Sequence, residues 1–221
     1  TGGANHVFIF KFCEAVDAET VRVLTSDNTW DELPAAFVFP LLRAENFKET
    51  IITPQLYVLL PYHANGIHLS ETEMDQYPQL KNYLEKHREK LMNRKGVLLQ
   101  SRMRKGCWWA LMGVGTYNFA PYKIVWEASG RNRFVPILIT GRYQVNQSLQ
   151  AYMSFNNKRD AMRVLRALKK KEVEKFVPKG IYENLKKHAE TDANQLIIDK
   201  EDEEFELELS KLCLSVCRVI I

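Results

Sequence analysis

The chain has 221 residues and a formal net charge of +4, with 46% hydrophobic and 26% charged residues. These proportions are typical of a globular protein and exclude a disordered one, and no apolar run approaches the roughly 18 residues that cross a bilayer. The four cysteines, at positions 13, 107, 213 and 217, include no CxxC pair, which favours reduced thiols in a cytoplasmic protein over a disulfide scaffold or structural zinc.

The first 65 residues are predicted to be rich in β-strands. Between residues 6 and 12, phenylalanines at every second position alternate with other side chains, which is the period of a strand. Three further runs show a similar pattern, at residues 20–24, 36–42 and 56–60. Prolines interrupt these runs, so we expect strands that are short, bent or at sheet edges.

A longer helix is predicted over residues 78–94. Ser70 and Glu73 have the spacing of a capping box, and Pro78 then opens the helix. Its apolar stripe consists of Leu80, Leu84, His87 and Leu91. On that stripe, His87 is better explained as a packed core histidine than as a ligand.

The second half alternates strands and helices. We expect strands at residues 122–127, 134–140 and 149–153, followed by a basic helix at 158–175 that Asn157 caps. A closing helix is predicted at 203–219. Its two cysteines, Cys213 and Cys217, lie one turn apart, where core packing is more plausible than metal binding.

These elements predict a mixed α+β fold in which strands from both halves form one central sheet, with helices around it. We expect one domain over residues 1–221, which could divide into a β-rich part, 1–75, and a basic α/β part, 76–221.

Charge is distributed unevenly. Residues 81–189 contain 24 Lys and Arg against 7 Asp and Glu, whereas residues 1–80 and 190–221 have net charges of −7 and −6. A basic middle favours a nucleic-acid partner, although lysine-rich solvated helix faces would give the same count.

Cations and aromatic residues are interleaved between residues 96 and 133. Cations attract phosphates, and aromatic rings stack on bases or sugars, so this mixture suits nucleic acid. The alternative is that the rings belong to the core, which we favour for Trp126 and hold equally open for Trp108 and Trp109.

Catalytic motifs are not evident. Gly113-Val114-Gly115 is followed by a proline and a strand rather than by a helix, so it is interpreted as a glycine turn and not as a phosphate-binding loop. The sequence contains no GxSxG elbow and no HExxH helix.

One segment resembles a known family. Residues 113–126, GVGTYNFAPYKIVW, are similar to the core of the C-terminal target-recognition domain of adenine-specific DNA methyltransferases in bacterial restriction-modification systems. Weaker similarities follow the same order along the chain, at residues 1–8, 77–94, 141–152 and 158–171. The start without methionine is consistent with a piece of a longer protein.

The resemblance implies a division of labour between two domains. An upstream catalytic domain would bind S-adenosylmethionine and transfer the methyl group, and this target-recognition domain would select the sequence of duplex DNA. The family's catalytic loop contains adjacent prolines, and the eight prolines here are never adjacent. We therefore expect no catalytic residue, cofactor or metal in this chain, and a cytoplasmic location without a membrane partner.

The resulting hypothesis assigns DNA-binding roles to cations, rings and amides. Phosphate contacts are expected from Arg94, Arg102, Arg104, Lys105, Lys123, Arg131 and Arg133, with Trp108 and Trp109 beside them. Readers of base edges are expected among Asn118, Arg131, Asn132, Gln144, Asn146 and Gln147. Turn capping is an equal alternative for the amides, and a solvent-facing strand position for Lys123. Two other functions remain open, namely a nuclease part of a fused restriction-modification enzyme and an RNA or single-strand binding module.

Overall fold

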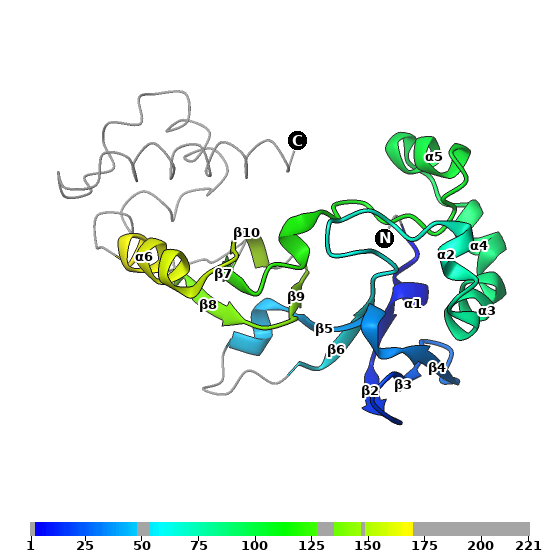
Figure 1. The fold of residues 1–221 in the computed structure, drawn as a ribbon, viewed down its shortest axis with the longest axis horizontal. Coiled ribbons are helices and arrows are strands. Elements are labelled where there is room, and N and C mark those ends of the chain that lie inside the picture. The colour runs from blue at the N-terminus through cyan, green and yellow to red at the C-terminus, as the bar shows by residue number, and fades with distance from the viewer. Residues whose placement is uncertain (1–2, 48–53, 128–134, 147–148, 170–221) are drawn as a thin grey trace. The chain divides into compact units, whose positions relative to one another are not determined.

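The computed structural model describes residues 3–47, 54–127, 135–146 and 149–169. Within them the fold is mixed α/β, with three small sheets and six helices (Figure 1). Contacts divide the chain into two compact units. In the described ranges, the first unit contains residues 3–42, 46–47, 54–119 and 142–144, and the second contains 43–45, 120–127, 135–141, 145–146 and 149–169.

A three-stranded antiparallel sheet lies near the start of the first unit. It consists of β2 (Phe12–Ala15), β3 (Thr20–Leu24) and β4 (Trp30–Pro34), in that order. The β2–β3 turn is held by Asp17, whose carboxylate accepts from the backbone N–H groups of Glu19 and Thr20 at 2.8 and 2.7 Å.

The four-stranded sheet joins distant parts of the chain. Its order is β1 (Ile9–Phe10), β6 (Leu56–Leu59), β5 (Val38–Leu42) and β9 (Gln144–Val145). β6 is antiparallel to both β1 and β5. β9 runs parallel to β5, which makes this the one mixed sheet among the three of the described residues.

The helices of the first unit are short. They are α1 (Asn5–Phe8), α2 (Glu71–Met74), α3 (Pro78–Lys86), α4 (Arg88–Met92) and α5 (Val97–Arg104). Single 3-10 turns occur at Ala35–Phe37, Ala44–Phe47 and Thr116–Asn118. Figure 1 shows α5 standing apart from α3 and α4.

The capping box that starts α2 is confirmed, since both of its hydrogen bonds are present between Ser70 and Glu73. The single helix expected over 78–94 is instead two, because the backbone leaves helical geometry at His87. The three leucines of the predicted stripe are nevertheless fully buried. His87 is half-buried beside Tyr83, and this burial lowers the pKa of its imidazole.

The core of the first unit is formed by the inner faces of its sheets and by the leucine stripe. Fully buried residues include Val7, Phe8, Phe10, Val23 and Leu33, along with the three leucines. The Tyr83 hydroxyl donates to the carbonyl oxygen of Val7 at 2.6 Å. This bond fixes α3 against the start of the chain.

The second unit packs a helix on a sheet. Its antiparallel strands are ordered β10 (Leu149–Phe155), β7 (Tyr122–Glu127) and β8 (Ile137–Thr140), and α6 (Lys158–Leu168) contacts all three. The predicted cap is confirmed, since the Asn157 side chain accepts from the backbone N–H of Asp160 at 2.9 Å. The buried face of α6 consists of Ala161, Val164, Leu165 and Leu168.

Several predicted elements differ from the structure. Residues 6–8 are helical rather than extended, because Val7 and Phe8 are both buried and do not alternate between two faces. The expected single central sheet is three separate sheets in the described residues. Residues 170–175 of the basic helix and the closing helix with Cys213 and Cys217 lie outside the described residues.

Candidate nucleic-acid interface

Arg94 is a structural residue here, contrary to its predicted role at a phosphate. Its side chain is buried, with 4% exposed. The guanidinium donates to the carbonyl oxygens of Leu91, Ala110 and Trp108 at 2.9, 2.8 and 2.7 Å. Burial lowers the pKa of the group. Arg94 thus ties the end of α4 to the segment that follows α5 and presents no charge to solvent.

The two adjacent tryptophans belong to the same core. Trp108 and Trp109 are 5% and 2% exposed, and their rings meet edge to face at a centroid distance of 5.2 Å. The guanidinium carbon of Arg88 lies 5.1 Å from the Trp108 ring centre and covers its outer side. The prediction that these rings face nucleic acid is therefore wrong for this structure, because neither offers a face for stacking.

The segment with the family resemblance begins in a tight glycine turn, as predicted. A Cβ at Gly115 would lie 2.7 Å from the Tyr117 ring, so any larger residue there requires that ring to move. A Cβ at Gly66, in the loop before α2, would lie 2.6 Å from the Gly115 Cα. The two loops therefore touch backbone to backbone. Tyr62 strengthens this contact, because its hydroxyl accepts from the Leu111 N–H at 2.7 Å.

Two of the predicted readers bind each other. The Asn118 side chain accepts from the Gly115 N–H at 2.9 Å and donates to the Gln144 side chain at 3.1 Å. Gln144 in turn donates to the Asn118 carbonyl oxygen at 2.8 Å and is itself buried. Turn capping, the alternative for these amides, is thus what the structure shows, and neither is placed to read a base.

Lys123 is buried within the second unit. Only 1% of the residue is exposed, and its ammonium donates to the Ala120 carbonyl oxygen at 2.7 Å. Burial lowers the pKa of the ammonium to about 8. The expectation of a phosphate contact and the alternative of a solvent-facing position are both wrong for this residue.

The three remaining predicted phosphate contacts that the structure describes lie exposed at the end of α5. They are Arg102, Arg104 and Lys105. Arg102 donates to the Leu111 carbonyl oxygen at 2.7 Å, which positions its guanidinium beside the glycine turn. Arg104 and Lys105 form no ion pair with any other described residue.

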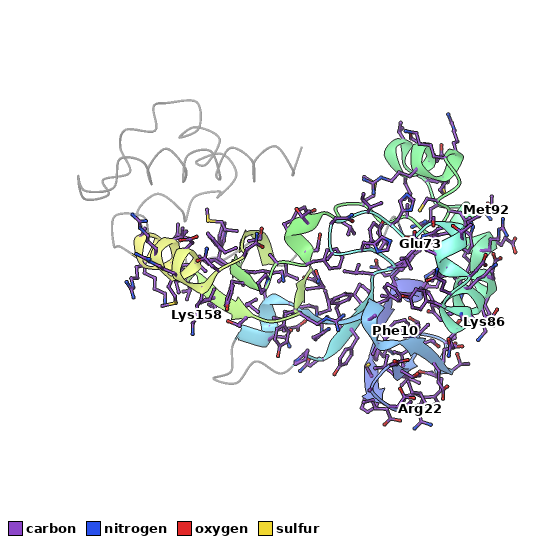
Figure 2. All side chains as sticks on the ribbon, viewed as in Figure 1. Phe10, Arg22, Glu73, Lys86, Met92 and Lys158 are labelled. Carbon is purple, nitrogen blue, oxygen red and sulfur yellow. The ribbon has the colours of Figure 1, made fainter. Side chains whose placement is uncertain are left out.

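A second cationic surface was missed in the prediction of site residues. The outward side of α6 and its end carry Lys158, Arg159, Arg163, Arg166 and Lys169, against the single acidic residue Asp160 (Figure 2 labels Lys158). All six are exposed. The sequence could have predicted this surface, because the cations occupy the positions that do not belong to the apolar stripe of the helix.

Three other cations of the helical region are paired with acidic residues, whereas Lys90 and Lys95 have no ion pair among the described residues. Lys81 pairs with Asp75, Lys86 with Asp31, and Arg88 with Glu85. By contrast, residues 90–126 contain seven Lys and Arg and no Asp or Glu. The exposed cations of α5 therefore have no acidic neighbour along a long stretch of chain.

The remaining predicted contacts are one residue that already has a partner in the protein and four that the structure does not describe. Asn146 is half-buried and already has an interaction within the protein. Arg131, Asn132, Arg133 and Gln147 lie outside the described residues, so their roles stay predictions.

The part of the chain that the structure describes contains no group of three or more His, Cys, Asp or Glu side chains that could hold a metal ion. His63 and Glu73 line an open pocket, where the His63 Nε2 lies 2.9 Å from a Glu73 carboxylate oxygen. Hydrogen bonds from Ser70 lower the pKa of the Glu73 carboxyl to about 2, which is consistent with its role in the helix cap. None of the described helices has the length and apolar character of a membrane span.

Comparison with known proteins adds no relative: no family model matches this chain, and no curated protein is significantly similar to it.

Proposed function

We propose that this chain binds duplex DNA and selects its sequence, as the target-recognition domain of an adenine-specific DNA methyltransferase in a restriction-modification system. In this proposal the methyl transfer and the S-adenosylmethionine site belong to an upstream catalytic domain. The proposal rests on the resemblance of residues 113–126 and on one structural observation, the exposed cations of α5 and α6.

Exposed cations in acid-poor surroundings are what phosphate binding requires. Such residues supply attraction that is independent of sequence, because each neutralised phosphate releases condensed counterions. The end of α5 supplies Arg102, Arg104 and Lys105, and α6 supplies a cationic face of its own. Sequence selection would then come from polar residues, for which Arg131, Asn132, Asn146 and Gln147 remain the candidates.

The two alternative functions have less support. Binding of single strands or RNA was argued from a Trp108-Trp109 stacking platform, and both rings are buried. Such binding depends on exposed aromatic faces. A metal-dependent nuclease needs acidic residues that bind the ion, and the described residues offer no group of three or more such ligands. Magnesium-dependent cleavage of DNA by the isolated chain would revive that alternative.

Charge reversal on α5 tests the proposal. Arg104→Glu should weaken binding to a labelled duplex and reduce the salt slope of log K by roughly 0.9, the value for one lost phosphate contact. The matched control is Lys11→Glu, which changes the charge equally at an exposed lysine in the acidic N-terminal segment of the sequence. The triple reversal of Arg102, Arg104 and Lys105 should nearly abolish binding. Unchanged affinity and salt slope in the triple variant would refute the proposed surface.

A further inference from the structure

The β2–β3–β4 sheet has an outer face that the DNA-binding proposal does not use. Residues directly opposite one another in an antiparallel sheet point to the same side. The register therefore places two rows on this side, Phe12–Leu24–Trp30 and Glu14–Arg22–Glu32. The opposite side carries Val23 and Leu33, which are fully buried in the core. We call the six outward residues the acidic aromatic face.

Two large aromatic rings on this face are exposed. Phe12 and Trp30 are 45% and 48% exposed, and their rings meet edge to face at a centroid distance of 5.7 Å. Trp108, Trp109 and Trp126 are buried, so Trp30 is the one exposed tryptophan of the four in the chain. Exposed aromatic pairs are uncommon on monomers and are enriched in protein interfaces.

Side chains of this face are also held in place before any partner binds. The Arg22 guanidinium carbon lies 5.0 Å from the Trp30 ring centre. The Nε of Arg22 donates to the Glu14 carboxylate at 2.7 Å. Figure 2 shows Arg22 on this sheet. Tryptophan and arginine are the residue types that most often dominate binding energy in interfaces, and fixed side chains lose less entropy on binding.

The charge of the surrounding residues indicates which class of partner this face would bind. On the face itself Glu14 and Glu32 stand against Arg22. Residues 11–34 contain six Asp and Glu against two Lys and Arg, although Asp31 lies on the opposite side of the sheet and pairs with Lys86. Arg22 is already engaged by Glu14, and Glu32 forms no ion pair with any other described residue. Phosphates would be repelled by this surface, so its ligand differs from that of the cations on α5 and α6. A cationic partner with an apolar side chain fits both the charge and the rings.

We propose that the acidic aromatic face docks a protein segment in which lysine or arginine residues flank an apolar side chain. The apolar side chain contacts Phe12 and Trp30, and the flanking cations pair with Glu32 and the neighbouring carboxylates. The chain would then have two different binding surfaces, one for DNA and one for a protein. This proposal does not depend on the DNA-binding proposal.

A random peptide library, selected on the immobilised full chain, tests the chemistry while the natural partner is still unidentified. Selected peptides without tryptophan are then synthesised and titrated, with protection of Trp30 from acrylamide quenching as the readout. The face variants are Phe12→Ser and Glu32→Lys. Their matched controls are Val97→Ser, which removes an apolar side chain that is 86% exposed on α5, and Glu89→Lys, which reverses an exposed acid on α4.

We expect the selected peptides to be rich in Lys and Arg with an apolar residue between them. Their affinity should fall by roughly tenfold or more in both face variants and stay within about twofold in both controls. Glu32→Lys keeps both rings, so it remains informative if Phe12→Ser fails to fold. The proposal is refuted if no peptide is enriched, if enriched peptides lack cations, or if the face variants bind them unchanged. Self-association in sedimentation that Phe12→Ser abolishes would show a second copy of the chain as the occupant and also refute it.

Discussion

Arg94 provides the sharpest test of how the protein uses its cations, because sequence reasoning placed it on DNA and the structure places it in the core. The change is Arg94→Met, which keeps most of the volume and removes every donor. Three carbonyl oxygens, those of Leu91, Ala110 and Trp108, then lose their partner. Hydrogen bonds from a charged donor each contribute about 1.5–3 kcal/mol to stability.

The net effect is smaller than the sum of these three contributions. Burying the guanidinium has its own desolvation cost, which Met does not have, and the carbonyls can recover water as the loop loosens. We therefore expect a loss of about 3–5 kcal/mol in the free energy of unfolding. Most small domains are stable by only about 5–15 kcal/mol, so the change removes a large share.

Urea unfolding followed by tryptophan fluorescence measures this loss, since Arg94 binds the carbonyl oxygen of Trp108, and Trp108 and Trp109 are both buried in the core of this unit. The matched control is Arg104→Met at an exposed position, which should change stability by less than about 0.5 kcal/mol and weaken DNA binding instead. A loss below about 1 kcal/mol in Arg94→Met would contradict the three-carbonyl arrangement. So would a folded Arg94→Met variant that binds DNA as poorly as Arg104→Met.

Two other changes test the packing of each unit. Gly66→Ala places a Cβ 2.6 Å from the Gly115 Cα at a φ of +79°, and should destabilise the first unit by about 2–4 kcal/mol. The control is Gly106→Ala, which has a similar φ of +92° but open space around the new Cβ, so it should lower the free energy of unfolding by only about 1 kcal/mol. Equal shifts of Tm in the two variants would contradict the contact between the Gly66 and Gly115 loops. Lys123 has a folded-state pKa of about 8 against a usual 10.5, so between these values the unfolded chain binds the extra proton and the contribution of this residue to stability rises with pH. Burial of Cys13 and Cys107 raises the pKa of their thiols and acts in the opposite direction, so the test is the difference between the native chain and Lys123→Met, which should shift in favour of the native chain as pH rises through this range. Parallel urea-unfolding curves for the two would count against a buried ammonium.

Local patterns in the sequence predicted local structure well. The Ser70–Glu73 box, the Asn157 cap and the glycine turn at residues 113–115 depend on neighbours a few residues apart, and the structure contains all three. The leucine stripe of the first unit was also predicted, because one helical face must be apolar to be buried. The break at His87 was not, since the leucines remain buried across it.

Two elements had no readable signal. Strand β4 has the sequence WDELP, in which Trp30 faces solvent and Asp31 pairs with Lys86, so apolar and polar positions do not mark the two faces. Helix α5 buries Leu99 in its first turn and leaves Val97 86% exposed, so its spacing shows no apolar stripe. Elements that bury little surface are therefore the ones that periodicity fails to predict.

The candidate site was predicted less well, for a related reason. Arg94 and Arg104 both stand among polar and basic neighbours, so their local sequence is alike. What separates them is the convergence of the Trp108 and Ala110 carbonyl oxygens on Arg94, which is fixed by the path of the chain after α5. Burial of Lys123 likewise depends on the strand pairing of β7. Composition reveals a surplus of cations but not which of them reach solvent.

Selection from a random duplex library by the full chain tests the central claim most directly, followed by competition of the selected duplex against single-stranded DNA and RNA at one salt concentration. A domain that reads duplex DNA should enrich a defined sequence and prefer it to both competitors by roughly tenfold or more. Arg104→Glu should bind that duplex more weakly, and Lys11→Glu should bind it as the native chain does. Enrichment of no sequence, or equal binding of all three nucleic acids, would contradict the account.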